Sequence, residues 1–132
     1  MDVHADVLEF HRRFNVPVST VPRLLRPDEY RFRLEFLIEE LNEFRAAHER
    51  GDLAEAADGL VDLIYVAAGT ALWMGLDLRA HWRAVQRANM LKVQVARAGD
   101  SKRQHPHDVV KPAGWVPPDH RQIILDTEAS GT

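Results

Sequence analysis

The chain has 132 residues, of which 45% are hydrophobic, and this fits one domain with a core of ordinary size. Its net charge of -3 argues against a general affinity for nucleic acid polymers or anionic membranes, so a small ligand is the expected partner. The absence of cysteine excludes disulfides, zinc-thiolate sites and thiol nucleophiles.

The first residues, Met1–Asp6, have neither a basic region nor an apolar run, so no secretory signal is expected. The most apolar segment, Leu60–Leu76, is interrupted by Asp62 and is expected to fall short of a membrane-spanning helix. The expected location is therefore cytoplasmic.

The first half of the chain predicts two helices. Apolar residues recur three or four positions apart over residues 2–14, which indicates a short amphipathic helix. A proline-containing connection follows, up to about Arg26. Pro27, with two acids directly after it, is typical of a helix start, and the second helix is expected to reach about Arg50, where Gly51 ends it.

Two further helices are expected. Asp52 is a suitable N-cap for a third helix that runs to Met74, and Gly75 ends it. A fourth is expected from Asp77 to about residue 97.

The expected fold class is all-α. A single domain over residues 1–132 would have a four-helix-type core at about residues 2–97. The composition after it changes to Gly, Pro, His and Lys, so an irregular C-terminal tail is expected over residues 98–132.

Five carboxylates gather in the middle of the chain. Glu39, Glu40 and Glu43 share one arc of the second helix, and Asp58 and Asp62 lie four residues apart on the apolar third helix. Acids placed so closely repel one another unless a cation lies among them, and a buried aspartate needs a partner. A site for a hard metal ion is the first hypothesis. The structural alternatives are an exposed acidic face and salt bridges from Arg12, Arg31 or Arg33.

Apolar residues accompany these acids on both helices. Phe32 and Phe36 lie on the arc of the glutamates, so this arc is expected to line a cleft with acids at one end and rings at the other. The third helix is apolar almost all round and is expected in the middle of an assembly, with the small residues Ala67–Ala71 allowing close packing across a subunit boundary. The second helix also carries an expected core stripe of Leu34, Leu37, Ile38, Leu41 and Phe44.

The fourth helix has Asn89 and Lys92 in line with its expected inward stripe of Leu78, Trp82 and Val85. An amide and an ammonium there favour an anionic ligand, and the alternative is a lysine that extends to solvent at the helix end.

The tail contains the rigid loop Lys111-Pro112-Ala113-Gly114-Trp115, in which Trp115 can serve as an anchor and Lys111 could reach a phosphate. His105 and His107 have no third metal ligand nearby in the sequence and are expected on the surface.

Together these motifs resemble the all-α nucleoside triphosphate pyrophosphohydrolases, the MazG-like and phosphoribosyl-ATP pyrophosphohydrolase-like superfamily, over about residues 27–119. The superfamily's second acidic motif is commonly Glu-x-x-Asp, but Gly59 stands at the glutamate position before Asp62, so Asp58 or Glu55 would supply that carboxylate. The resemblance is carried by Glu39-Glu40-x-x-Glu43, the segment from Asp58 to Val66, Gly69-Thr70-Ala71, Arg87-Ala88-Asn89-Met90-x-Lys92 and the Lys111-Pro-x-Gly-Trp loop.

The resemblance implies hydrolysis of a nucleoside triphosphate between the α and β phosphates, with Mg²⁺ or Mn²⁺ as cofactor. The implied metal ligands are Glu40, Glu43, Asp62 and Asp58, and Glu39 is the candidate that orients or deprotonates the water. Asn89 and Lys92 would bind phosphate or sugar, Lys111 would close over the phosphates, and Phe32, Phe36, Tyr65 or Trp73 would stack on the base.

The resemblance also implies a homodimer or a homotetramer, with active sites completed across subunits. The alternative function is a non-catalytic helical bundle that binds nucleotide or a partner protein and uses the acids as a structural cation site. Base preference stays open, because aromatic stacking tolerates any base.

Overall fold

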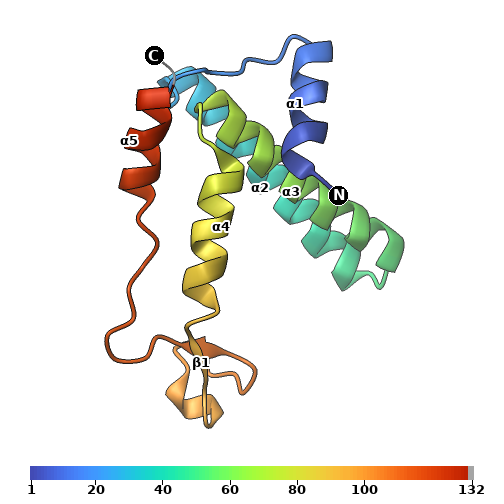
Figure 1. Cartoon of the computed structure of the whole chain (residues 1–132). Coiled ribbons are helices and arrows are strands. Elements are labelled where there is room, and N and C mark those ends of the chain that lie inside the picture. Colours follow the sequence, from blue (N-terminus) through green and yellow to red (C-terminus); the bar gives the residue numbers. More distant parts are fainter. Residues whose placement is uncertain (131–132) are drawn as a thin grey trace. The chain divides into compact units, whose positions relative to one another are not determined.

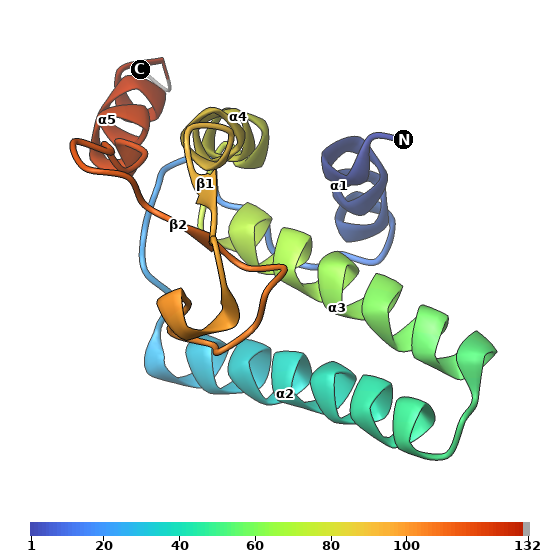
Figure 2. The same cartoon turned by 90° about the horizontal axis from the view of Figure 1, so that it is seen from below.

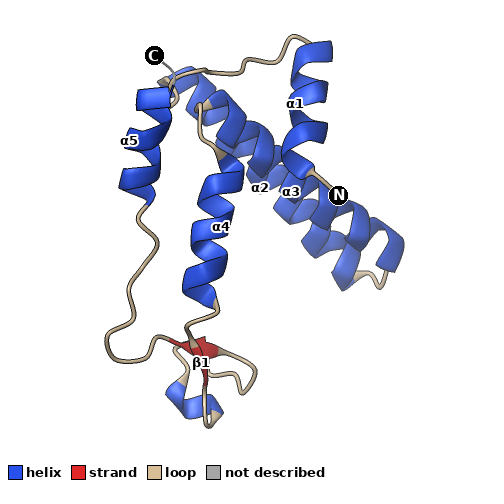
Figure 3. Ribbon diagram, viewed as in Figure 1, coloured by secondary structure: helices blue, strands red, loops and turns tan. Residues whose placement is uncertain are grey.

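The computed structural model describes residues 1–130 and is mainly helical, with one two-stranded sheet among those residues (Figures 1 and 3). It divides into two compact units: Met1–Leu78 with the residues from Ile124 onward, and Arg79–Ile123. The predicted all-α class is confirmed. In chain order the elements are α1 (Val3–Arg13), α2 (Pro27–Glu49), α3 (Leu53–Trp73), α4 (Leu78–Asn89), β1 (Val93–Gln94), a 3-10 turn (Ala98–Asp100), β2 (Val109–Val110) and α5 (His120–Ser130).

The first three helices begin and end close to the predicted residues because the expected local signals are present. Pro27 occupies the first turn of α2, and Asp52 accepts a hydrogen bond from the backbone N–H of Glu55 at 3.0 Å as the N-cap of α3. Gly51 and Gly75 follow α2 and α3 with φ of 77° and 69°, the left-handed conformation that commonly ends a helix.

The C-terminal part differs from the prediction in two ways. The fourth helix ends at Asn89 rather than near residue 97, because the valine-rich segment β1 pairs with β2 in an antiparallel ladder. The segment expected to be irregular also contains α5, whose start is fixed by the Asp119 side chain, which accepts from the backbone N–H of Gln122 at 3.0 Å.

In the first unit, α2 and α3 form an antiparallel hairpin, and α1 packs on α3 (Figures 1 and 2). The buried centre beside α1 consists of Val7, Ala68 and Leu72. The hairpin is closely packed at Gly59, where an added Cβ would lie 2.9 Å from the backbone nitrogen of Phe44. The two helix backbones therefore touch at this position without a side chain between them.

The predicted core stripe of α2 is wrong in part. Leu34, Ile38 and Leu41 are 38%, 47% and 45% exposed in the chain. On α3, which was expected in the middle of an assembly, Leu60 and Ile64 are also exposed. The physical reason is geometric: α3 contacts α2 on one side and α1 on another, and these contacts leave the remaining apolar faces of the hairpin uncovered.

The predicted inward stripe of α4 is wrong in part, since Trp82 is exposed. Leu78 packs against the buried centre and Val85 is half-buried, while the fully buried side chains of α4 are the small residues Ala84 and Ala88.

By length and composition alone, α3 could cross a membrane, and within residues 1–130 it is the one helix that meets both measures. This differs from the expectation that the segment falls short of a spanning helix. Such a match is weak evidence, because the core helix of a water-soluble protein passes the same test.

The close contact at Gly59 predicts that Gly59→Ala destabilises the protein. Pushing the α2 backbone aside costs about 1–3 kcal/mol, whereas alanine regains about 1 kcal/mol of helix propensity, so we expect a net loss of about 1 kcal/mol. Urea unfolding followed by circular dichroism measures this change.

The matched control is Gly99→Ala, because a Cβ at Gly99 meets no atom within 4 Å. A Gly59→Ala protein as stable as the wild type would show that the two backbones can separate at no cost.

Candidate active site

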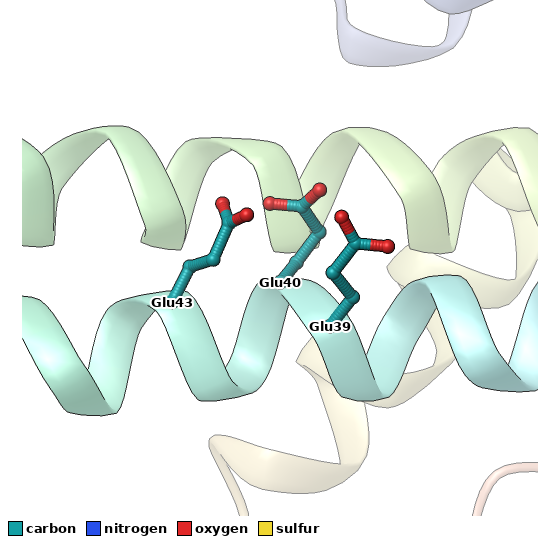
Figure 4. Close-up of side chains that lie close together, drawn as sticks. All are labelled: Glu39, Glu40 and Glu43. Atoms are coloured by element: carbon teal, nitrogen blue, oxygen red, sulfur yellow. The ribbon is translucent and has the colours of Figure 1, made fainter.

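Helix α2 places three glutamates together. The side chains of Glu39, Glu40 and Glu43 each offer an oxygen, and these oxygens all lie within 4.8 Å of one another. Figure 4 shows the three carboxyl groups turned to the same side of α2, with Glu40 between the other two. The spacing of one, three and four residues on a helix produces this grouping directly.

Glu40 is the buried member of this cluster. It is 7% exposed, and its Oε2 has no hydrogen-bond partner among residues 1–130. Burial, together with the charges of Glu43, Asp62 and Glu39, raises the pKa of Glu40 to about 7. A cation held by these oxygens would remove the repulsion between the carboxylates and would give the buried Oε2 of Glu40 a partner.

Helix α3 adds two aspartates to this group of acids. The pKa of Asp62 is raised by burial and then by the charges of Asp58 and Glu43, so these three side chains lie near one another. Asp58 therefore acts on Asp62, whereas Glu55 lies in the first turn of α3 and is not among the groups that shift the pKa of Glu40 or of Asp62.

The structural alternative of salt bridges to these aspartates is contradicted. None of the ion pairs within residues 1–130 includes Asp58 or Asp62. Arg33 instead donates to Thr70 and to the backbone carbonyl of Val66. Within residues 1–130 the five candidate acids are therefore without the basic partners that would make them structural.

The absence of a glutamate at position 59 has a steric reason in this chain. Position 59 is buried and directed at the Phe44 backbone, which leaves no space for any side chain. Of the two candidates for the missing carboxylate, only Asp58 is among the groups that raise the pKa of Asp62, so Asp58 is the one that we retain.

The aromatic candidates fall into two groups. Phe36 contacts Phe32, with ring centroids 6.0 Å apart, and Phe32 contacts Trp73 at 6.2 Å. Tyr65 is apart from these rings and contacts Phe10 of α1 edge to face at 5.5 Å. Phe32 and Phe36 lie on α2, one and two turns before the glutamates, so their predicted place in a common cleft stays a prediction.

Trp73 has a structural partner that the sequence analysis missed. Its ring N–H donates to Glu29 at 2.8 Å, and Glu29 also accepts from Arg23 and from the backbone N–H of Arg26. These donors lower the pKa of Glu29 to about 2. The signal that could have revealed it is the position of Glu29 in the first turn of α2, where an acid reaches back to the N-cap.

In the second unit, two predicted phosphate ligands meet at one ring. The ammonium groups of Lys92 and Lys111 lie 5.4 and 5.0 Å from the ring centroid of Trp115. Trp115 is itself anchored, because its ring N–H donates to the carbonyl of Ala88 at 2.7 Å. Asn89 is exposed at the end of α4, and its carbonyl accepts from the backbone N–H of Lys92.

The fold and the acidic group define a class: an all-α protein with clustered carboxylates of the kind that hold a hard divalent cation. A comparison with protein families then gives a match to the phosphoribosyl-ATP pyrophosphohydrolase model over residues 7–89. This is more than half of the chain, so the chain belongs to that family, and the resemblance predicted from its motifs is confirmed. The family is one of pyrophosphohydrolases with nucleotide substrates. No curated protein matches the chain.

The raised pKa of Glu40 predicts a pH-dependent stability in metal-free protein. The pKa of Glu40 is about 7 in the folded state and 4.5 ordinarily. Between pH 4.5 and 7 the Glu40 carboxyl is therefore protonated in the folded state but mostly ionised in the unfolded state. The Glu40 contribution to the free energy of unfolding therefore falls as pH rises through this window. We expect Glu40→Gln to remove this pH dependence. The free energy of unfolding of the variant, relative to that of the wild type, should therefore increase from pH 4.5 to 7.

The free energy of unfolding of Glu40→Gln must be compared with that of the wild type at each pH, because His11 changes the stability of both proteins with pH in the opposite direction. Burial lowers the pKa of His11 below 6.5, so its contribution to stability rises with pH. Urea unfolding in EDTA at several pH values gives the free energy of unfolding of both proteins. Glu35→Gln is the control, because Glu35 is exposed. A constant difference between wild type and Glu40→Gln would contradict the prediction.

Proposed function

We propose that the chain hydrolyses a nucleoside triphosphate between the α and β phosphates in a reaction that depends on Mg²⁺. The observation that carries the proposal is the buried Glu40, which lies among other acids with an unpaired oxygen. A protein that keeps such a group without a basic partner is suited to binding a cation there.

The donor set fits a hard metal ion. The proposed ligands are Glu40, Glu43, Asp62 and Asp58, which offer only carboxylate oxygens. When bound, Mg²⁺ would neutralise phosphate oxygens and lower the pKa of a coordinated water. Mn²⁺ has similar ligand preferences and is expected to substitute for it.

The remaining residues would bind and orient the reactants. Glu39 is exposed but belongs to the same group of oxygens, so it can accept a proton from the attacking water and hold the water in place. We assign phosphate binding to Lys92 and Lys111, whose positions are set by Trp115, and we assign sugar binding to Asn89.

For the base we favour Phe36 with Phe32, because this ring pair lies on the helix that carries the glutamates. Tyr65 was the other predicted residue. Its contact with Phe10 and the influence of Asp6 and Glu9 on its pKa associate it with α1, so a role in stacking would have to involve that helix.

We further propose that the chain forms a homodimer or a homotetramer through its uncovered apolar surface. Ile38 and Leu41 are exposed on α2, and Leu60 and Ile64 recur along α3. Exposed apolar residues in such runs commonly mark a protein interface. Location in the cytoplasm remains a proposal from the sequence.

The first experiment measures release of pyrophosphate from a panel of ribo- and deoxyribonucleoside triphosphates and from phosphoribosyl-ATP, with Mg²⁺, with Mn²⁺ and with EDTA. We expect turnover of at least one triphosphate that EDTA abolishes. Glu39→Gln should reduce kcat about 100-fold or more, the contribution of a positioned acid–base group. Glu40→Gln should in addition raise the Mg²⁺ concentration needed for half-maximal activity, because it removes a ligand.

Glu35→Gln is the matched control, since Glu35 is an exposed acid on the same helix. Activity on phosphoribosyl-ATP alone would contradict the proposed substrate class. Folded protein that binds nucleotide but releases no pyrophosphate, with Glu40→Gln unchanged, would favour the non-catalytic binder.

The oligomer is tested by sedimentation. We expect the wild type, with a chain mass of 15.1 kDa, to sediment as a dimer or a tetramer. Ile64→Lys should shift it toward monomer, because a charge would replace a residue that the partner covers. Leu53→Lys is the control: Leu53 is on the same helix and is 85% exposed. A wild type that is monomeric at all concentrations would contradict the proposal.

A further inference from the structure

A second polar feature of the first unit lies outside the acidic cluster. A pocket of about 380 Å³ opens between α2, α3 and the connection before α2. Its walls are mostly apolar, with Leu25, Leu34, Leu37 and Met74 among them, and the polar side chains of Arg33 and Thr70 also line it. None of the five acids of the candidate active site is among the residues around it.

Arg33 is the unusual member of this pocket, because it is only 5% exposed and yet has no anionic partner. Its Nε donates to the Thr70 hydroxyl at 3.0 Å, and its Nη2 donates to the Val66 carbonyl at 2.8 Å. Both acceptors are neutral. None of the ion pairs within residues 1–130 includes Arg33.

The nearest acid on the same helix, Glu29, is engaged elsewhere. Its carboxylate accepts from Arg23 at 2.9 Å and from Trp73 at 2.8 Å. On the other side Arg33 meets His11: a Cβ added to Gly69 would lie 2.8 Å from Arg33 Nη2 and 2.6 Å from His11 Nε2. Neither neighbour supplies the negative charge that a buried guanidinium needs.

Aromatic rings hold the guanidinium in place without neutralising it. The central carbon of Arg33 lies 5.8, 5.5 and 5.7 Å from the ring centroids of Phe32, Phe36 and Trp73. Such contacts stabilise a cation, but they supply no negative charge that would pair with a buried guanidinium. They also leave Nη1, which has no hydrogen bond within residues 1–130, as a free donor.

We propose that this pocket binds a small organic carboxylate, whose anionic group pairs with Arg33 and whose apolar body packs against the leucines and Met74. The planar guanidinium matches the two oxygens of a carboxylate. A single cation lines the pocket, so a monoanion is balanced by it, whereas a phosphate dianion would retain an uncompensated charge. None of the five acids lines this pocket, so the proposal goes beyond the proposed hydrolysis; Arg33 nevertheless contacts Phe32 and Phe36, the rings proposed for the base.

The experiment is a calorimetric titration of the full chain with octanoate, and in parallel with 1-octanol, which has the same apolar body without the charge. We expect octanoate to bind at least tenfold more tightly than 1-octanol. Arg33→Met should remove at least tenfold of the octanoate affinity, because it keeps the apolar stem and loses the charge. Arg31→Met, at an exposed arginine of the same helix, should bind as the wild type does.

A second variant keeps the test valid if Arg33→Met fails to fold. Leu25→Trp leaves Arg33 intact and fills the pocket, so it should also weaken octanoate binding at least tenfold. Equal affinity for octanoate and 1-octanol, no binding by the wild type, or full binding by both variants would overturn the proposal. Competition between octanoate and a nucleoside triphosphate would show that the two ligands share a site and would overturn the proposal of a second site. The proposed hydrolysis is tested independently by the pyrophosphate-release assay.

Discussion

The backbone contact between α2 and α3 at Gly59 is the constraint on which the rest of the first unit depends. Because no side chain separates Phe44 from Gly59, the two helices approach closely enough for acids from both to influence one another. Glu43 of α2 acts on Asp62 of α3 for this reason, whereas Asp58 acts on Asp62 as its neighbour four residues earlier on α3. A bulkier residue at position 59 would move the helices apart and would weaken the grouping on which the proposed metal site rests.

Two buried glutamates on α2 show how surroundings decide the role of an acid. Glu29 is surrounded by donors from Arg23, Arg26 and Trp73, which hold its pKa near 2 and make it a structural anchor. Glu40 is surrounded by other acids and has a pKa of about 7. The first carboxylate is already satisfied, and only the second gains from a bound cation. Arg33 presents the opposite case, a buried cation that lacks an anion.

Burial of the exposed apolar side chains of the α2–α3 hairpin would favour its association with another chain. Two helices and the short α1 bury only a small centre around Val7, Ala68 and Leu72. Ile38, Leu41 and Ile64 would be costly to expose to water in a permanent monomer. An assembly that covers them would also place α3 in an interior, where its apolar composition suits it, which connects its sequence character to the proposed oligomer.

Several features of this protein follow from the sequence alone. Pro27, Asp52, Gly51 and Gly75 define helix limits because capping and left-handed glycines act within a few residues. The grouping of Glu39, Glu40 and Glu43 follows from helical spacing, and the family follows from the motifs.

Only the tertiary structure decided the rest, because it depends on contacts between residues that are distant in the chain. The effect of Glu43 on Asp62 required the register between α2 and α3, and the shortened α4 required the pairing of β1 with β2. The sequence showed Arg33 as one basic residue among several. Packing against Thr70 and Val66 is what buried its charge without an acid beside it.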